Sequence, residues 1–396
     1  MEIKLLASNL PTQDKVIYEE VIEQCGMSAS ICYMSGTYDD IVARGREGNT
    51  RTAKIALGNG HHSVADHIQL SFLIENCSKI VAMFLNSIGC YGTSEKSARY
   101  TIMKNCSEEE QVLYDKWVEK LKPMILKTYP DKFDEKQAKK LAMENARLFL
   151  SVFTPSTTLK YTVNIKDINY IIDWCERFVA DDRYPDTYFY NKLKEELKTL
   201  GEKLKEIAYI DILRDHKKRK FDFLESVNFA DVNKCTEFGM TYNTYYEGTF
   251  AFVAQEERHR TLLHTVYFAG VPYKFYVPEI LTDESDRNEW LEDMKTVAHL
   301  IPQGTIVGVR EQGTLEKFKL KCTERMCGRA QLEIMRQTVD TYYKYREALE
   351  FKVSEGKNEY REPLRSLLEV SSCVKCGFMT CKEPCMWGKN ANTRLI

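Results

Sequence analysis

The chain has 396 residues and a formal net charge of −2, from 56 basic and 58 acidic side chains. This balance excludes a global electrostatic attraction to nucleic acid or to an anionic membrane, so any functional basic site must be local. No apolar run approaches the roughly 20 residues that cross a bilayer, and the opening MEIKLLASNL lacks the features of a signal peptide. We therefore expect a cytoplasmic protein of two or three domains that binds neither nucleic acid nor membranes.

The first half predicts strands where polar and apolar residues alternate, and helices where apolar residues recur every three or four positions. Strands are expected at 4–10 and 69–76, and helices at 12–25, 50–57, 79–90, 107–150 and 190–207. The basic run in IDILRDHKKRKFDF ends the helical periodicity, and we place a domain boundary there, between residues 214 and 215.

The second half predicts a strand-like aromatic region, a strand, one long helix and a cysteine-rich tail. We expect the aromatic region at 242–255, the strand at 304–311, the long helix at 314–352 and the tail at 371–396. The tail contains a C-x2-C-x4-C-x3-C array that suits tetrahedral zinc, with an iron–sulfur cluster or free thiols as the alternatives. The four predicted metal ligands are Cys373, Cys376, Cys381 and Cys385.

The segment TSEKSARY carries Glu95, Ser97 and Arg99 at alternating positions. In an extended segment these three side chains point to the same side. An arginine and a serine can then hold a phosphate while the carboxylate contacts a sugar or base, although a solvated strand edge would show the same pattern.

Two other stretches concentrate histidine and charge. GHHSVADH at 60–67 lacks the HExxH spacing of a zinc site, which favours a polar turn that lines a pocket. QEERHRTLLH at 255–264 places two acids before an Arg-His-Arg triplet. This triplet is either part of a helix surface neutralised by its acids or a binding site for an anion.

The first half resembles the flavin-dependent thymidylate synthases. Their signature runs roughly GHxSxxEH, an apolar strand, SR, a helix with QxxRHR, and seven residues later the Ser of ExSxRY. Asp66 and Lys79 are conservative departures, and Ser-Ile-Gly at 87–89 stands where Arg-His-Arg belongs. The matching positions are His61, Ser63, His67, Ser78, Glu95, Ser97, Arg99 and Tyr100.

The second half contains what the first half lacks. It reproduces QxxRHR, but Phe268 replaces the expected serine. A later part of the family pattern is divided between the halves in the same way. The first half has Ala146-Arg147, Asn164 and Lys166, but Cys175 stands in place of an arginine. The second half has that arginine, Arg325, followed by AQLEI at 330–334. The resemblance therefore implies two diverged tandem copies, at 1–214 and at 215–396 including the tail.

The resemblance implies an α+β fold in which each copy has a central antiparallel-rich sheet with flanking long helices, so that one chain is a pseudo-dimer. Because the family forms homotetramers with sites between subunits, a homodimer (a pseudo-tetramer) is implied. The implied reaction is FAD-dependent methylene transfer from methylenetetrahydrofolate to C5 of dUMP, with reduction to dTMP and NADPH as the reductant. A different uridine nucleotide or product, or a non-catalytic nucleotide- or flavin-binding protein, are the alternatives.

The resemblance also assigns roles to individual residues, and none of the thirteen cysteines is expected to be catalytic. The catalytic residues would be Arg258, His259 and Arg325. FAD would be bound by His61, Ser63, Asn164, Arg258, His259 and Arg260. The nucleotide would be surrounded by Glu95, Ser97, Arg99, Arg147, Gln255 and Arg325.

Overall fold

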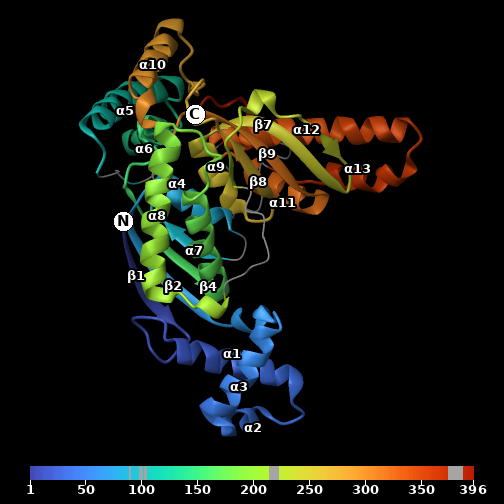
Figure 1. Ribbon diagram of the computed structural model, residues 1–396. Helices are drawn as coiled ribbons and strands as arrows, with labels where there is room; N and C mark the ends of the chain where they lie inside the picture. Colours follow the sequence, from blue (N-terminus) through green and yellow to red (C-terminus); the bar gives the residue numbers. More distant parts are fainter. Residues whose placement is uncertain (89–90, 98–100, 102–104, 214–222, 373–386) are drawn as a thin grey trace. The chain divides into compact units, whose positions relative to one another are not determined.

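The computed structural model describes residues 1–88, 91–97, 101, 105–213, 223–372 and 387–396 (Figure 1). It divides into two compact units. The first unit is Met1–Ser97 with Pro155–Phe221, and the second unit is Ala98–Thr154 with Asp222–Ile396. Residues 98–154 therefore cluster with the second unit, although they precede the predicted sequence boundary between residues 214 and 215.

The first unit is built on a four-stranded antiparallel sheet. Its strands, in spatial order, are β1 (Glu2–Ser8), β2 (Gln69–Cys77), β4 (Thr157–Asn164) and β3 (Gly92–Glu95). Helices α4 (Lys79–Ser87), α7 (Ile165–Val179) and α8 (Tyr188–Ala208) pack beside the sheet (Figure 1). The side chains of Leu70, Phe72 and Ile74 alternate along β2 and are fully buried, as the period of a strand with a buried face requires.

A helical segment connects β1 and β2 in the first unit. It contains α1 (Tyr18–Tyr33), α2 (Tyr38–Ala43), α3 (Gly45–Gly58) and the short helix η1 (His62–Ala65). The α1 and α3 backbones approach closely at Gly26, where an added Cβ would lie 1.9 Å from the carbonyl oxygen of Asn49. Glycine is therefore required at this position for the two helices to pack.

The second unit contains a five-stranded sheet, antiparallel except where β5 (Leu224–Glu225) pairs with β8. The strand order is β5, β8 (Leu263–Tyr267), β9 (Ile306–Thr314), β7 (Thr241–Thr249) and β6 (Glu237–Phe238). Its main helices are α9 (Phe250–Glu256), α11 (Leu315–Arg325), α12 (Leu332–Ser354) and α13 (Arg361–Leu368). The order β6-β7-β9-β8 repeats the order β1-β2-β4-β3 of the first unit.

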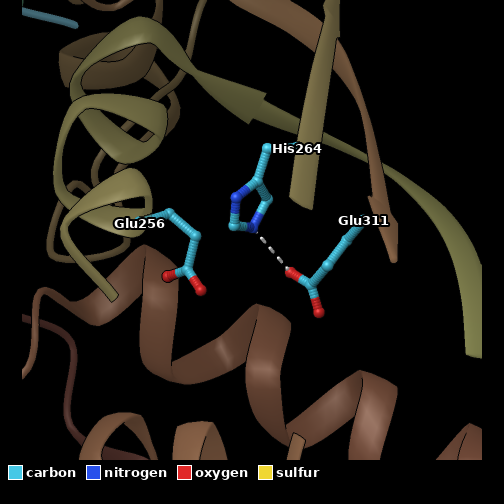
Figure 2. A group of neighbouring side chains, drawn as sticks. All are labelled: Glu256, His264 and Glu311. Carbon is cyan, nitrogen blue, oxygen red and sulfur yellow. Dashed lines mark hydrogen bonds and ion pairs between the residues drawn. The ribbon is translucent and has the colours of Figure 1, made fainter. Parts of the chain in front are cut away.

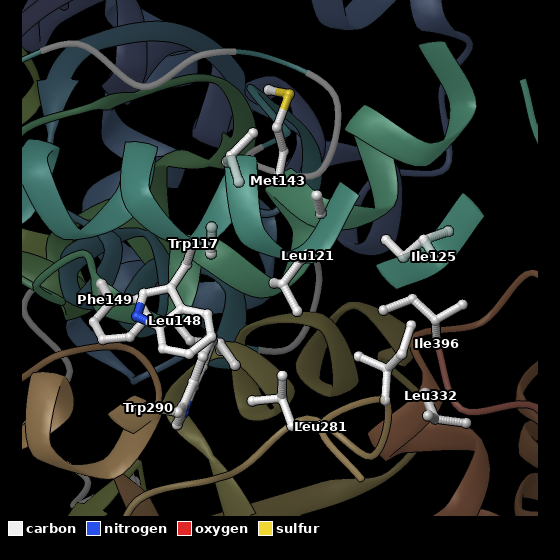
Figure 3. Packing of buried hydrophobic residues seen from close by; sticks show 14 of the residues in the cluster. Trp117, Leu121, Ile125, Met143, Leu148, Phe149, Leu281, Trp290, Leu332 and Ile396 are labelled. Atoms are coloured by element: carbon white, nitrogen blue, oxygen red, sulfur yellow. The ribbon is translucent and has the colours of Figure 1, made fainter. Parts of the chain in front are cut away.

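Four further helices of the second unit enclose a hydrophobic core (Figure 3). They are α5 (Glu108–Thr128), α6 (Glu135–Ala146), η2 (Arg147–Phe149) and α10 (Glu284–Thr296). The rings of Trp117 and Trp290 lie 4.8 Å apart, and Phe149 lies 4.6 Å from Trp290. The indole N–H of Trp117 donates to Asp293 at 2.7 Å, so its polar atom is satisfied inside the core.

The structure confirms the α+β class and most predicted elements, but it corrects the bounds of several of them. The predicted helix 12–25 begins only at Tyr18, and 107–150 is divided into α5, α6 and η2. The strand-like region 242–255 changes to helix α9 after Thr249, whose hydroxyl accepts a hydrogen bond from the backbone N–H of Phe252 at 2.9 Å and caps the helix. Within the described residues no helix could span a membrane.

The long helix predicted at 314–352 is interrupted between α11 and α12. Met326 leaves the helical conformation at ψ 57°, and Gln331, with ψ 137°, precedes the first turn of α12. Helical periodicity continues on both sides of this break, which is why the sequence predicted one helix. The break brings the side chain of Gln331 into the candidate site.

Candidate functional site

The predicted Arg-His-Arg triplet forms a turn at the end of α9. Residues Glu257–His259 make one 3-10 turn (η5), and Arg260 adopts a left-handed φ of 56°, which is strained for a residue other than glycine. The side chains of Arg258 and Arg260 are partly or fully exposed, whereas His259 is buried. The turn thus presents two cationic side chains on either side of a buried imidazole.

The environment of His259 favours a neutral ring. Its Nδ1 lies 3.0 Å from a carboxylate oxygen of Glu324 on α11, and its Nε2 is buried without a hydrogen-bond partner among the described residues. Burial lowers the pKa of His259, helped by the charges of Arg325 and Lys321 and opposed by Glu256 and Glu324. A neutral imidazole with one unsatisfied nitrogen can accept or donate one hydrogen bond to a ligand.

A largely buried ionic cluster lies next to this turn, and Figure 2 shows three of its members, the buried Glu256 and Glu311 and the partly buried His264. The ammonium group of Lys321 lies 2.6 Å from Glu311 Oε2 and 2.9 Å from Glu256 Oε1. His264 Nε2 lies 3.3 Å from Glu311 Oε2. Burial alone would raise the pKa of Glu311, but Lys321 and His264 outweigh it and lower that pKa.

Two carboxylates and a histidine that converge in this way could hold a metal ion. In this protein the ammonium group of Lys321 already supplies a positive charge to both carboxylates. Hydroxyl groups of Tyr242 and Tyr246 donate to Glu311 at 2.6 and 2.7 Å. Lysine therefore already provides a cation to both carboxylates, and we assign the cluster no metal.

A second polar cluster joins residues from the two predicted copies within the second unit. Arg147 on η2 and Gln255 on α9 both donate to Oε1 of Gln331, at 2.9 and 2.6 Å. Gln331 in turn donates to Glu333 Oε2 at 3.2 Å. Arg147 and Gln255 were both predicted to surround the nucleotide, so the structure brings two of these residues together although they are 108 positions apart.

Gln331 and Glu333 were not predicted as site residues, although the AQLEI motif that contains them was recognised. Glu333 accepts hydrogen bonds from the backbone N–H and the hydroxyl of Thr249, at 2.7 and 2.9 Å. Burial raises the pKa of Glu333 to about 7, although these hydrogen bonds and Arg147 act to lower it. The sequence feature that could have indicated Gln331 and Glu333 was the fixed spacing of the AQLEI motif after Arg325.

The first unit contains the predicted carboxylate at the end of β3. Glu95 lies 2.6 Å from the ammonium group of Lys79, and its oxygens also accept from Asn86 and Thr157, each at 3.3 Å. Lys79 stands where the family signature has an arginine, and here it neutralises Glu95. Ser97 is partly buried, and Arg99 and Tyr100 lie outside the described residues.

The predicted FAD-binding residues of the first unit occupy two different local settings. His61 and Ser63 are exposed around η1, and the His61 ring lies 6.2 Å from that of Tyr33. Asn164 caps α7 by accepting from the N–H of Asp167 at 2.8 Å. Within the described residues, His61, His62, Asp66 and His67 do not bring three metal-ligand atoms together.

The predicted site residues are thus distributed over both units. His61, Ser63, Glu95, Ser97 and Asn164 belong to the first unit, and Arg147, Gln255, Arg258, His259, Arg260 and Arg325 belong to the second. Arg325 is the last residue of α11, one turn beyond Lys321. The cysteines predicted to bind zinc, Cys373, Cys376, Cys381 and Cys385, lie outside the described residues.

Comparisons with known proteins find one family model and several solved structures that are similar to part of this chain. Residues 17–173 match the family model of the thymidylate synthase complementing protein. A solved structure of the flavin-dependent thymidylate synthase ThyX from Helicobacter pylori, complexed with FAD and dUMP, is similar at 15% identity and a TM-score of 0.29, over 54% of this chain and 96% of that chain. The UMP/dUMP methylase PolB from Streptomyces cacaoi, bound with 5-Br dUMP, gives 15% identity and a TM-score of 0.31, over 52% and 88%. No curated protein matches the chain.

Proposed function

Because residues 17–173 belong to the thymidylate synthase complementing protein family, a family of flavin-dependent thymidylate synthases, we propose that this chain methylates dUMP to dTMP. The methylene group would come from methylenetetrahydrofolate, and NADPH would reduce the flavin. The observation that carries the proposal is that Arg147 and Gln255 both donate to Gln331. Arg147 comes from the first predicted copy and Gln255 from the second, and each is the copy in which the family residue is present.

The Arg-His-Arg turn has the properties that a flavin site requires. FAD, when bound, would carry the one-carbon and redox chemistry. His259 would offer its unsatisfied Nε2 to the cofactor, while Arg258 and Arg260 would meet anionic or carbonyl oxygens. His61, Ser63 and Asn164 of the first unit would contribute the remaining FAD contacts.

The nucleotide would be held by charged and amide side chains from both copies. Arg147, Arg325 and Arg99 would bind phosphate or polarise a pyrimidine carbonyl, because a guanidinium presents parallel N–H donors. Gln255 is already aligned with Arg147 through their shared partner Gln331. Glu95 and Ser97 would complete the site from the first copy.

The proposed organisation is a tandem duplication at 1–214 and 215–396, in which each copy kept one side of a shared site. The common strand order of the two sheets supports this proposal. Two chains would then form a homodimer with the architecture of a pseudo-tetramer. We further propose a cytoplasmic location and a structural zinc ion bound by the four cysteines between 373 and 385.

The proposal is tested first by the absorbance of the purified protein. An oxidised flavin absorbs at about 375 and 450 nm, and we expect these bands after purification or after FAD is added. A protein that takes up no FAD would contradict the proposal. Mass-resolved products from dUMP, and in parallel from UMP, with methylenetetrahydrofolate and NADPH then distinguish dTMP synthesis from modification of another uridine nucleotide.

A further inference from the structure

The two units can be compared position by position, because strand ends and helix starts correspond. Helix α4 follows Ser78 as its N-cap, and α9 follows Thr249; likewise α7 follows Asn164 and α11 follows Thr314. Counting from these caps gives three pairs of equivalent positions in the two units. The pairs are Leu85 and Glu256, Tyr161 and Glu311, and Ile171 and Lys321.

The strand pairing supports this equivalence independently. Tyr161 on β4 is paired with Thr93 on the neighbouring strand β3. Glu311 on β9 is paired in the same way with His264 on β8. Thr93 and His264 each lie in the second position of their strand, so the register agrees with the count from the helix caps.

In the first unit these three positions form an apolar contact region. Leu85, Tyr161 and Ile171 are all fully buried. The hydroxyl of Tyr161 donates to the backbone carbonyl of Leu85 at 2.8 Å, so no polar group is left unsatisfied there. The sheet and helices of this unit therefore pack at these positions without any ionic group.

In the second unit the same positions hold Glu256, Glu311 and Lys321, again fully buried. Removing two carboxylates and an ammonium group from water is costly, and buried ionic clusters are often no more stabilising than apolar side chains of similar volume. The first unit demonstrates that the apolar solution packs in this arrangement of strands and helices. Packing alone therefore does not explain the ionic cluster.

What distinguishes the second unit at this place is the Arg-His-Arg turn. Glu256 is the last residue of α9 and directly precedes the turn. Lys321 lies one helical turn before Glu324 and Arg325 on α11. Glu324 in turn contacts His259. In the first unit the equivalent sequence positions hold Ser-Ile-Gly at 87–89, and Cys175 stands in the place of Arg325.

We infer that Glu256, Glu311 and Lys321 are positioning residues, which fix the end of α9 against α11 so that Arg258, His259 and Arg325 are held in one arrangement. A buried ion pair is specific for its partner, because separating the two charges leaves each of them unpaired away from water, whereas apolar side chains can slide past one another. The carboxylate of Glu256 makes no hydrogen bond to a described residue, so its attraction to Lys321 is its principal polar interaction.

The test is to transplant the residues of the first unit into the second, as the combined variant Glu256→Leu, Glu311→Tyr and Lys321→Ile. We expect a folded protein that is less stable than wild type, because Tyr242 and Tyr246 lose their acceptor Glu311, and whose FAD affinity falls at least tenfold. The ring nitrogen signals of His259, followed by NMR in the FAD-free protein, should shift as its contact with Glu324 is lost. Lys317→Ile on the exposed face of α11 is the matched control and should change neither readout.

The change in FAD affinity rests on the proposed function, whereas the change in the His259 signals does not. Failure of the proposed function can therefore be distinguished from failure of the positioning role. Unchanged His259 signals in the folded combined variant would overturn the inference. If that variant does not fold, Glu256→Gln decides, because it removes one charge at constant size. A folded Glu256→Gln protein should also shift the His259 signals, and wild-type signals would count against the positioning role.

Discussion

The two units share a strand order but differ in what lies between the strands. In the first unit, β1 and β2 are joined by the helices α1–α3, whereas in the second the equivalent β6 and β7 are separated only by residues 239–240. Between β3 and β4 the chain inserts α5 and α6, whereas between the equivalent strands β8 and β9 it inserts α10. Sheet order is therefore preserved while the connections vary, as expected when a buried core constrains strands more than loops.

The candidate site residues, unlike the strand order, differ between the two units. The first unit holds Glu95 by Lys79, Asn86 and Thr157, and the position equivalent to Glu95 in the second unit is the buried Val266. A carboxylate and a valine thus occupy the same place in two packed sheets. We conclude that the fold does not require a polar residue at this position, which agrees with the proposed role of Glu95 in binding a nucleotide.

The largest expected effect on stability comes from breaking the ionic cluster of the second unit. Lys321→Met leaves two buried carboxylates without a cation and should lower the free energy of unfolding by about 3–5 kcal/mol. The equivalent change in the first unit, Ile171→Met, is nearly volume-conserving and should cost less than about 1.5 kcal/mol. Urea unfolding measures both, and equal costs would contradict the contrast between the units.

A smaller effect is expected from Glu333, because its pKa of about 7 lies above the ordinary carboxyl value of 4.5. The folded state holds this proton more tightly than the unfolded state, so the stabilisation is complete below pH 4.5 and is lost as the pH rises through 7. Glu333→Gln cannot ionise. Relative to wild type it should therefore gain about 2–3 kcal/mol between pH 5 and pH 8.

Chemical denaturation at several pH values checks this prediction. The matched control is Glu279→Gln, since Glu279 lies on the surface of the same unit in an ion pair with Arg336. A constant difference between wild type and Glu333→Gln across this pH range would mean that Glu333 is ionised throughout.

The smallest effect concerns the two equivalent helix caps. Thr249 caps α9 through its hydroxyl, whereas Ser78 makes no side-chain cap and donates instead to Glu196 at 3.2 Å. Thr249→Ala should therefore cost about 1–2 kcal/mol, and Ser78→Ala about 0.5–1 kcal/mol. Thermal unfolding of the two variants under one condition measures the difference, and the reverse order would show that the cap of α9 is unimportant.

Strong periodicity made much of the fold predictable from the sequence. The alternation in β2 and the apolar spacing of α4 gave the correct element types, because each element buries one continuous face. The change from strand to helix at Thr249 was missed, since aromatic and β-branched residues continue from β7 into α9 and only the cap marks the boundary.

The candidate site was predictable where motifs have fixed spacing and not where residues meet only in the folded chain. The signature indicated Arg147 and Gln255, but their common partner Gln331 depends on the break between α11 and α12. The buried Lys321 was likewise hidden, because a lysine within a charged helix normally lies in solvent. Its burial depends on Glu256 and Glu311, which come from two other elements.

The central claim is that one site is assembled from residues retained in different copies. It is tested most directly by the turnover of dUMP to dTMP in two single variants, Arg99→Ala from the first copy and Arg258→Ala from the second. The account predicts that each variant folds, and that each loses at least about a thousandfold in kcat/KM, or about 4 kcal/mol of transition-state stabilisation. Full activity in either variant would contradict the account, because that copy would then contribute nothing to the site.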